Sequence, residues 1–437
     1  MPESVAERMR DDWNRRATED AHYYVAFGRR NQDGEEFFDT AREQVLGLEL
    51  ELKRLPPADP RSRRALEIGC GPGRLMRPMS RHFGEIHGVD ISDRMVARAR
   101  ENLAGVPHAH PHHAPNSNLE AFASNSFDFV YSYAVFQHIP SREVVLGYLD
   151  EAQRILKPGG ILRCQLNGLP QTAKHYDTWS GVRIPAGDVL AFARERGLLV
   201  LAMEGIETQY MWTTMRKPPS PFSFPAAKLR IRRVTNAYSS EPIAPVSGRF
   251  AALSLWVEGL PADTGLNEIS VEVGGKPAFA TYLGHPEHDS LQQLNVLLPE
   301  GLSTGAAPVR VILGGDRAES WIRLMPAGPR VPKLLSVTDG VDLMSGTSIV
   351  NGVVKMTVEE VIDPATVQAS ISGVPVVDIE SFRTDPRLPR WELNFQVPAV
   401  VPPGPAWLEV RAGARLLGRE SIEIGVRSPD ATIGNSP

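Results

Sequence analysis

The chain has 437 residues, a formal net charge of −5 at pH 7 and a hydrophobic content of 42%. This length predicts two to four domains, and the apolar content is that of a folded protein. The small negative charge, without a Lys/Arg-rich block, argues against a nucleic-acid scaffold. No stretch reaches the ~18 consecutive apolar residues of a membrane helix, and the charged N-terminus lacks the apolar region of a secretory signal. We therefore expect a cytoplasmic protein without a nucleic-acid or membrane partner.

From the N-terminus to about residue 217, helical patterns alternate with short apolar strands. Residues 37–55 carry apolar residues at three- and four-residue spacing, which predicts an amphipathic helix. The other predicted elements are strands at 64–68, 85–91, 127–136, 159–168 and 209–214, and helices at 94–103 and 143–156. Strands that alternate with helices predict an α/β domain with a doubly wound, mostly parallel sheet. The only cysteines, Cys70 and Cys164, fall in or beside these strands and are expected to be reduced.

The composition changes near residue 220. Residues 217–225, KPPSPFSFP, hold four prolines and predict a linker. Beyond it, short β-like runs are separated by Gly, Pro and Asp, and LQQLNVLLP (291–299) matches RWELNFQVP (390–398). A period near one hundred residues has the size of an immunoglobulin-like sandwich, with chance similarity as the alternative. The predicted domains are an α/β domain at 1–217, a linker at 218–228, and immunoglobulin-like β-sandwiches at 229–328 and 331–428.

Residues 65–76, ALEIGCGPGRLM, place three glycines at alternate positions after a predicted strand. Gly69, Gly71 and Gly73 can adopt positive φ, and they leave room for a ligand against the main chain. A strand that ends in such a loop and opens into a helix suits a nucleotide-like molecule. Asp90 ends the next strand, at about the ~20-residue distance of a ribose-binding carboxylate. No Lys-Ser/Thr follows the glycines, which excludes the phosphate-cradling loop of nucleotidases.

Four motifs within residues 10–217 resemble those of the class I S-adenosylmethionine-dependent methyltransferases. They are ALEIGCGPGR, GVDIS, SFDFVYSYAVFQHIP and RILKPGG, in the family's order and at compatible spacing. The resemblance implies S-adenosyl-L-methionine as the cofactor, with Gly69 and Gly71 against it. It also implies that Glu67 orients the amino end of the cofactor and that Asp90 holds its ribose. The cofactor-binding candidates are Glu67, Gly69, Cys70, Gly71, Gly73, Asp90, Ile91, Asn116, Asn118 and Ser132.

The sequence departs from this family at the position that contacts adenine. An acidic residue is common before the fourth-strand motif, and here Pro115 takes that position. The resemblance therefore leaves the adenine contact to Asn116 or Asn118, whose side-chain amides can replace the carboxylate.

Methyl transfer needs the acceptor atom in line with the sulfonium methyl group, so positioning supplies most of the acceleration. His138, in FQHIP, is placed to act as a general base toward a hydroxyl or amine acceptor. The alternative is a histidine that braces the following helix. Tyr133, at the end of a predicted strand, can offer its aromatic face to the cationic sulfur, with plain core packing as the alternative.

Three further segments bear on the substrate and on metal binding. The loop 169–185 is long and rich in polar aromatics, and loops of this kind carry function. The predicted substrate residues are His175, Tyr176, Asp177 and Trp179 in that loop, with Trp13, Tyr23 and Tyr24 as an opposite wall or lid. The loop could instead only buttress the sheet.

The histidine-rich run PHAHPHH (107–113) contains no carboxylate or cysteine, so we expect a solvated edge and no metal.

The two predicted sandwiches contain no catalytic constellation. Their combination with the first domain resembles bacterial proteins in which a methyltransferase domain carries immunoglobulin-like repeats, which suggests a protein or glycan partner. The predicted function is methyl transfer from S-adenosylmethionine to an unidentified acceptor, oxygen or nitrogen rather than carbon, and possible acceptors include small molecules. The first alternative is an inactive cofactor-binding or scaffold protein that acts through its sandwiches. The second is a nicotinamide-dependent oxidoreductase, against which the spacing of the glycines argues.

Overall fold

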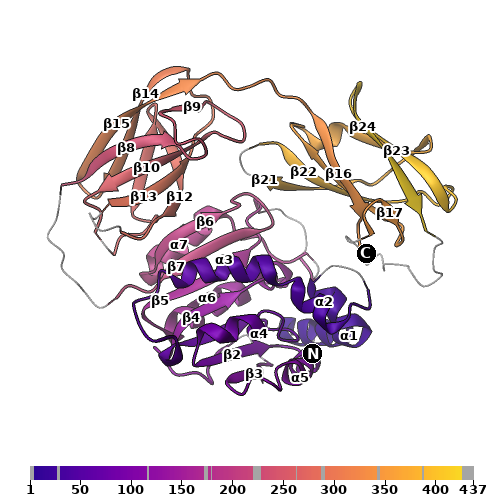
Figure 1. The fold of residues 1–437 in the computed structure, drawn as a ribbon, viewed down its shortest axis with the longest axis horizontal. Coiled ribbons are helices and arrows are strands. Elements are labelled where there is room, and N and C mark those ends of the chain that lie inside the picture. Colours follow the sequence, from indigo (N-terminus) through magenta and orange to yellow (C-terminus); the bar gives the residue numbers. More distant parts are fainter. Residues whose placement is uncertain are drawn as a thin grey trace. The chain divides into compact units, whose positions relative to one another are not determined.

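The computed structural model describes residues 4–26, 30–115, 118–171, 176–178, 180–219, 228–261, 263–286, 291–341, 345–385 and 388–425 (Figure 1). The chain divides into two compact units. The first contains residues 1–19 and 41–328, and the second contains residues 20–40 and 329–437. This division differs from the predicted boundaries, because it joins the first sandwich to the α/β domain and assigns residues 20–40 to the second sandwich. The predicted four-segment division stays a prediction.

The α/β domain of the first unit is built on a sheet of strand order β3-β2-β1-β4-β5-β7-β6. The pairs among β1 to β5 are parallel, and β7 runs antiparallel to both of its neighbours. The doubly wound sheet predicted from the sequence is therefore confirmed. The strands are β1 Arg64–Ile68, β2 Glu85–Asp90, β3 Ala109–His113, β4 Phe127–Ser132, β5 Leu156–Leu166, β6 Leu199–Glu204 and β7 Met211–Arg216.

Helices precede and connect these strands, and local capping sets where two of them begin. The hydroxyl of Ser92 accepts a hydrogen bond from Met95 N at 3.1 Å, and the hydroxyl of Ser141 accepts one from Val144 N at 3.3 Å. A serine in this position satisfies an amide that lacks a partner within the helix. The α-helices are α1 Val5–Ala26, α2 Gly34–Asp39, α3 Arg42–Leu52, α4 Met76–Met79, α5 Asp93–Asn102, α6 Arg142–Ile155 and α7 Ala186–Arg196. The 3₁₀ turns are η1 Pro60–Ser62, η2 Ser80–His82, η3 Phe136–His138 and η5 Pro364–Thr366.

The single helix predicted at 37–55 was wrong in its continuity. The chain turns at residues 40 and 41, between α2 and α3. The hydroxyl of Thr40 donates to Phe37 O at 2.6 Å and closes the end of α2 locally. A threonine hydroxyl that bonds to the preceding turn competes with helix continuation. The apolar spacing is the same on both sides of this turn, so periodicity alone does not reveal it.

The sheet of the α/β domain continues into the first β-sandwich. Tyr282 of β12 pairs antiparallel with Ala202 of β6, so β12 covers the edge of the domain. An uncovered edge strand would leave main-chain donors and acceptors unpaired. The strands of this sandwich are β8 Arg230–Asn236, β9 Ile243–Pro245, β10 Ala252–Glu258, β11 Ile269–Val273, β12 Lys276–Leu283, β13 Leu291–Leu297, β14 Gly305–Leu313 and β15 Asp316–Met325.

Asn267 strengthens this junction. Its Oδ1 accepts from Val200 N and its Nδ2 donates to Leu198 O, each at 3.0 Å, while Leu266 N donates to Val200 O at 2.7 Å. The buried Arg54, two residues after the end of α3, donates to Leu283 O of β12 at 2.8 Å. The α/β domain and the first sandwich therefore share main-chain hydrogen bonds and not only side-chain packing.

The second unit contains two sheets, of orders β16-β18-β22-β21 and β17-β24-β23-β19-β20. Its strand bounds repeat those of the first sandwich, since β23 and β24 follow β14 and β15 at an offset of 99 residues. This offset equals that of the matched sequence segments. The strands are β16 Lys333–Asp339, β17 Ser348–Ile349, β18 Val353–Glu359, β19 Val367–Ile371, β20 Val374–Pro375, β21 Glu380–Asp385, β22 Arg390–Gln396, β23 Gly404–Ala412 and β24 Arg415–Ile424.

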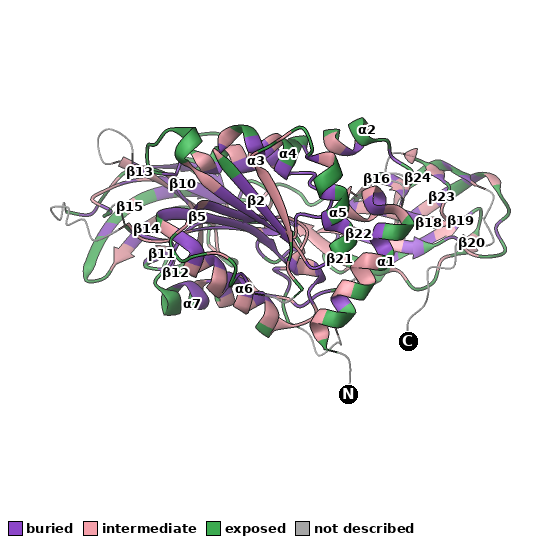
Figure 2. Cartoon of the chain, turned by 90° about the horizontal axis from the view of Figure 1, so that it is seen from below, coloured by how far each residue is buried: buried purple, intermediate pink, exposed green. Residues whose placement is uncertain are grey.

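The buried residues follow the strands in both units (Figure 2). Phe127, Phe129 and Val130 of β4 are fully buried, as expected for a central strand covered on both faces. Cys70 and Cys164 are buried and free. Among the described residues, no helix is long and apolar enough to cross a membrane.

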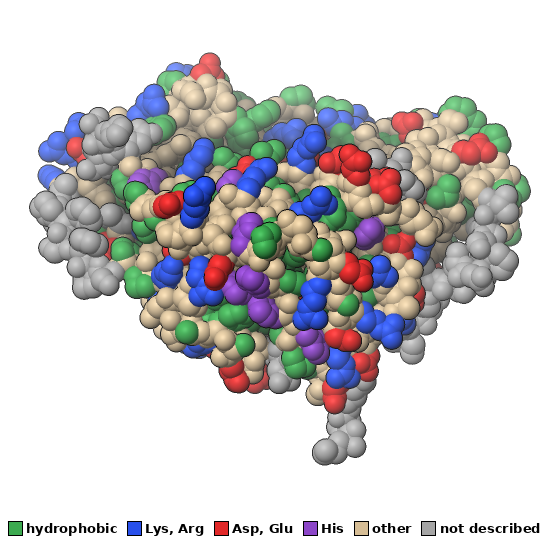
Figure 3. All heavy atoms as spheres, turned by 60° about the horizontal axis from the view of Figure 1, so that its bottom comes forward, with side chains coloured by type: hydrophobic (Ala, Val, Ile, Leu, Met, Phe, Trp, Pro, Cys, Tyr) green, Lys and Arg blue, Asp and Glu red, His purple; other side chains and the backbone are tan. Residues whose placement is uncertain are grey.

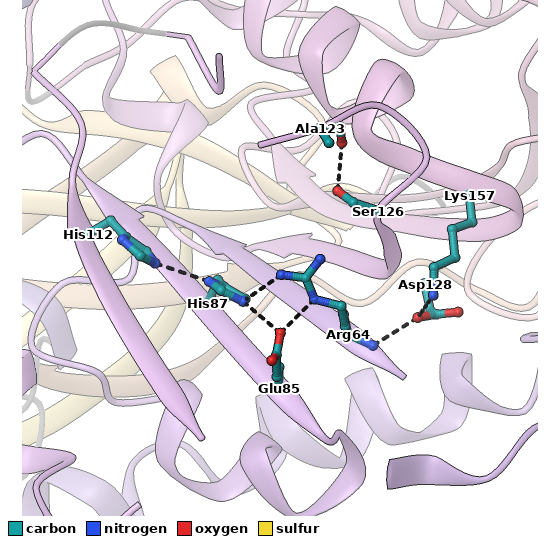
Figure 4. Close-up of polar contacts among 8 residues, drawn as sticks. All are labelled: Arg64, Glu85, His87, His112, Ala123, Ser126, Asp128 and Lys157. Atoms are coloured by element: carbon teal, nitrogen blue, oxygen red, sulfur yellow. Dashed lines mark hydrogen bonds and ion pairs between the residues drawn. The ribbon is translucent and has the colours of Figure 1, made fainter. Parts of the chain in front are cut away.

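Histidine side chains gather on one face of the molecule (Figure 3). Part of this group lies on β2 and β3, where His87 Nδ1 is 3.0 Å from His112 Nε2 and the ring centroids of His87 and His110 are 5.1 Å apart. His87 Nε2 is 3.1 Å from an Arg64 nitrogen and 3.4 Å from Glu85 Oε2 (Figure 4). Within the described residues, this group does not meet the geometry of a metal site.

Asp128 ties three strands together beside this cluster (Figure 4). Its Oδ2 accepts from Arg64 N at 2.8 Å and from Lys157 Nζ at 2.7 Å. The carboxylate thus links the start of β1 to β4 and to the start of β5.

Acidification is expected to destabilise the fold through His87. Burial lowers the pKa of His87 to about 4, and the hydrogen bond to Glu85 only partly opposes this shift. The unfolded chain binds this proton near pH 6.5, so the free energy of unfolding should fall as the pH decreases from about 7 to 4. The expected loss in free energy of unfolding is about 2 kcal/mol. This is less than the full pKa shift would give, because solvent still reaches part of the ring and screens its charge.

The measurement is thermal unfolding of the wild type and His87→Phe between pH 7.5 and 4.5. Phenylalanine can keep the edge contacts with Phe122 and Phe127, whose ring centroids lie 5.6 and 5.5 Å from that of His87, but it cannot bind a proton. The variant should show a shallower fall in melting temperature. Parallel curves for the two proteins would contradict the prediction. Arg64, Glu85, His110 and His112 face His87 and are unchanged in both proteins.

Candidate functional site

The glycine loop follows β1 and closes against β2. Gly69, Gly71 and Gly73 have φ values of 73°, 50° and 85°, a region that favours glycine. The amides of Gly69 and Cys70 both donate to Val89 O, at 2.8 and 3.0 Å. These bonds bring the loop onto the end of the neighbouring strand, at the carboxyl edge where open α/β sheets bind ligands.

The missing side chain at Gly69 makes room for another part of the protein. A Cβ atom at this position would lie 2.2 Å from Cγ2 of Val135, in the segment after β4. The sequence predicts that the glycines leave space for a ligand. At Gly69, however, the side chain of Val135 fills the space beside Cα. The glycine is therefore required for the approach of two loops at the end of the sheet.

Asp90 ends β2 and is held by main-chain amides through both carboxylate oxygens. Oδ2 accepts from Gly71 N and Oδ1 accepts from Ser92 N, each at 2.8 Å. Burial raises the pKa of Asp90, and the two amide hydrogen bonds oppose this shift. The carboxylate is partly exposed, so its remaining lone pairs can accept hydrogen bonds from a ligand.

Glu67, on β1 beneath the glycine loop, is almost entirely buried at 3% exposure. The hydroxyl of Tyr131 donates to its Oε2 at 3.0 Å. Burial raises the pKa of Glu67 to about 8, although the bond from Tyr131 and the positive charge of Arg74 favour the ionised form. A cation brought beside this carboxyl would favour release of its proton.

The other predicted cofactor residues have different surroundings. Cys70 is buried, which raises the pKa of its thiol well above the usual value. The hydroxyl of Ser132 is buried and donates to Ile68 O at 2.9 Å, so it holds β4 to β1. Ile91 is buried beside Asp90, and Asn118 lies partly buried after β3. Asn116 lies outside the described residues.

Tyr133 follows β4 and is held from three sides. Its ring stacks on Trp212 of β7 at 5.5 Å between centroids, and its hydroxyl accepts from Gln44 Nε2 at 3.3 Å. The guanidinium of Arg74, which follows the glycine loop, lies 5.4 Å from the ring centroid and hydrogen bonds to the hydroxyl. The phenol is thus fixed in position near the glycine loop.

His138 ends the 3₁₀ turn η3 and is 8% exposed. Trp13 of α1 meets its ring edge-on at 5.7 Å, and Gln137 Nε2 lies 3.4 Å from its Nε2. The loop after β5 docks on the same turn, because Gly181 N donates to Gln137 O at 2.8 Å. A Cβ at Gly181 would lie 2.5 Å from that carbonyl oxygen, so only glycine permits this approach.

The predicted substrate residues are only partly described. Asp177 closes a turn, since its Oδ1 accepts from Ser180 N at 2.6 Å, and Tyr176 packs against the main hydrophobic core. His175 and Trp179 lie outside the described residues. Tyr23 and Tyr24 belong to the second compact unit, where the guanidinium of Arg30 lies over their rings. Their predicted roles at the substrate stay predictions.

The glycine loop and Asp90 lie within a stretch of the chain that matches a known protein family. Residues 66–164 match the family described as a methyltransferase domain, and this range includes the glycine loop, Asp90 and His138. Residues 66–164 therefore belong to a methyltransferase domain.

Curated relatives of this methyltransferase domain are named for different methylation reactions. A ubiquinone biosynthesis O-methyltransferase of Cereibacter sphaeroides is 33% identical over 110 residues, which cover 25% of this chain and 43% of that protein. A trans-aconitate 2-methyltransferase of Rhodopseudomonas palustris is 31% identical over 137 residues, covering 31% of this chain and 49% of that protein. Phosphoethanolamine N-methyltransferase 2 of Caenorhabditis elegans is 37% identical over 97 residues, covering 22% of each chain. The chain spans less than half the length of these three relatives.

Sequence reasoning missed several residues of helix α1 that contact the methyltransferase domain. Arg16 is buried and donates to Thr178 O at 3.3 Å, while Asp12 hydrogen bonds to the Thr178 hydroxyl. Asp12 and Arg16 also form an ion pair at 3.8 Å. Their i,i+4 spacing is visible in the sequence and indicates the pair itself. The spacing does not predict the contacts with Thr178, because Thr178 lies more than 160 residues away along the chain.

Proposed function

We propose that this protein transfers a methyl group from S-adenosylmethionine to an oxygen or nitrogen atom of an acceptor. One observation carries the proposal: Asp90 ends β2 with both carboxylate oxygens held by amides, one of them from the glycine loop. A carboxylate so placed can accept hydrogen bonds from the two ribose hydroxyls of a nucleoside. The curated relatives include proteins named as O- and N-methyltransferases, which favours these acceptor atoms over carbon.

The residues around the glycine loop fit a cationic nucleoside. Glu67 offers a buried carboxyl that a nearby cation would ionise, and it lies close enough to Asp90 for their charges to interact. When bound, the cofactor supplies an electrophilic methyl group on a positively charged sulfur. Asn116 or Asn118 is proposed to contact the adenine. Cys70, Ile91 and Ser132 would line the site mainly through their main chains and packing.

On the acceptor side, we propose that the protein acts by holding and deprotonating the acceptor. His138 is the proposed general base, because it lies on the turn after β4 and is enclosed by Trp13 and by the loop after β5. Tyr133, fixed by Gln44, Arg74 and Trp212, is proposed to face the reacting centre. The proposed recognition residues are His175, Tyr176, Asp177 and Trp179, with Tyr23 and Tyr24 as further candidates.

The sandwiches are proposed to be immunoglobulin-like domains that recruit a protein, a glycan or a bulky substrate. Support comes from their mostly antiparallel strand pairs and from the 99-residue repeat of strand bounds. A cytoplasmic location is likewise a proposal.

The first test is calorimetric titration of S-adenosylmethionine into the wild type and Asp90→Ala. Loss of two hydrogen bonds to a charged group should weaken binding at least about 100-fold, about 2.7 kcal/mol. Asp150→Ala is a matched control, because Asp150 lies on α6 and pairs with Arg196 at the surface. Absence of binding by the wild type would refute the proposal. Binding without methyl transfer to any acceptor in a screen would instead indicate an inactive cofactor-binding protein.

A further inference from the structure

Helix α1 reaches the loop that carries Asp90. Asn14 on this helix accepts a hydrogen bond from the hydroxyl of Ser92 at 2.6 Å and donates its Nδ2 to Asp93 Oδ1 at 2.7 Å. Arg94 N lies 3.5 Å from the same Asn14 oxygen. Asn14 therefore bonds to the turn between β2 and α5 with both ends of its amide, although 78 residues separate it from Ser92.

Ser92 connects Asn14 to the carboxylate. Its side chain is fully buried, its amide donates to Asp90 Oδ1 at 2.8 Å, and its hydroxyl also accepts from Met95 N at 3.1 Å. Because the hydroxyl is held by Met95 and by Asn14, Ser92 is restricted in rotation. The amide that fixes Asp90 Oδ1 therefore belongs to a residue whose position depends in part on α1.

The same helix contacts the acceptor side of the site. One residue before Asn14, Trp13 meets the ring of His138, and two residues after it, Arg16 bonds to Thr178 in the loop after β5. The first turns of α1 thus lie against the ribose carboxylate loop, the proposed base and the substrate loop. These contacts all lie within the first compact unit.

We propose that Asn14 is a positioning residue for the ribose-binding carboxylate, acting on Asp90 through Ser92. In this proposal Asn14 acts through Ser92 and not by direct contact with the cofactor. Its amide holds the Asp90–Ser92 turn so that Oδ1 of Asp90 stays on Ser92 N while Oδ2 stays on Gly71 N. This inference rests on the proposed function, because it assumes that Asp90 binds the ribose of S-adenosylmethionine.

The test compares the affinities of two ligands for the full chain, S-adenosylhomocysteine and its 2′-deoxyribose analogue. Asn14→Ala should weaken binding of S-adenosylhomocysteine about 10-fold and change binding of the deoxy analogue less than about 2-fold. The difference is expected because the analogue lacks one hydroxyl that Asp90 would accept from. Arg15→Ala is the matched control, since Arg15 is an exposed neighbour on α1 that pairs with Asp12 and Glu19, and it should leave both affinities unchanged.

A second variant tests the same inference in case Asn14→Ala does not fold. Asp93→Ala removes the partner of Asn14 Nδ2 and leaves Asp90 and Ser92 intact, so it should show the same ligand selectivity with a smaller loss, about 3-fold. An equal loss for both ligands in both variants would overturn the inference and leave Asn14 with a purely structural role. Absence of S-adenosylhomocysteine binding by the wild type would refute the proposed function instead.

Discussion

Gly69→Ala is expected to destabilise the methyltransferase domain by about 2–5 kcal/mol and to abolish cofactor binding. Two costs add at this position. An alanine at φ 73° pays roughly 1–2 kcal/mol for the left-handed conformation. Its Cβ would also lie 2.2 Å from Cγ2 of Val135, so the loops after β1 and β4 must separate, at an overpacking cost of about 1–3 kcal/mol.

A double-variant cycle separates these two costs. Val135→Ala in the Gly69→Ala background should recover the steric part and leave the conformational part of about 1–2 kcal/mol. Gly47→Ala is the control, because Gly47 lies in helix α3 and its added Cβ meets nothing within 4 Å. That change should be neutral or slightly stabilising. The measurement is chemical unfolding monitored for the first unit, and a wild-type midpoint for Gly69→Ala would show that the two loops move apart freely.

His138→Ala is expected to lower the rate of single-turnover methyl transfer by about 10²–10⁴-fold. The expectation follows from the proposal that His138 removes the proton of the acceptor. His138→Ala should leave cofactor affinity within about 2-fold of the wild type, because Asp90 and the glycine loop are held in place by main-chain amides and by Val89 O. The measurement combines quench-flow kinetics with calorimetric titration.

The structural alternative for His138 makes a different prediction. The ring packs against Trp13 and lies beside Gln137, so a bracing histidine would affect stability and the seating of α1. His138→Gln fills similar space and should keep the packing while removing the base. A rate restored by His138→Gln would contradict catalysis by the imidazole, whereas a low rate in both variants together with a normal melting temperature would support it.

The sequence predicted the α/β domain well because its signals are local. The apolar run 64–68 coincides with β1, and the run 85–91 ends one residue beyond β2. Asp90 stands at the end of its strand as the motif indicates, since the strand and the turn are both encoded within a few residues. The break between α2 and α3 was missed, because the hydroxyl of Thr40 closes the helix without changing the apolar spacing.

The sequence by itself determined the alternation of strands with helices in the α/β domain and the position of the glycine loop. Each depends on side-chain periodicity, backbone freedom or composition within a short window. Only the tertiary structure decided that Val135 fills the space at Gly69, that Asn14 holds the Asp90 turn, and that β12 covers the edge of β6. These contacts join segments that are far apart in the chain. The local sequence of each segment would also allow it to pack against other exposed strand edges or side chains. The choice among them is made by packing and hydrogen bonding over the whole unit, which no short stretch of sequence records.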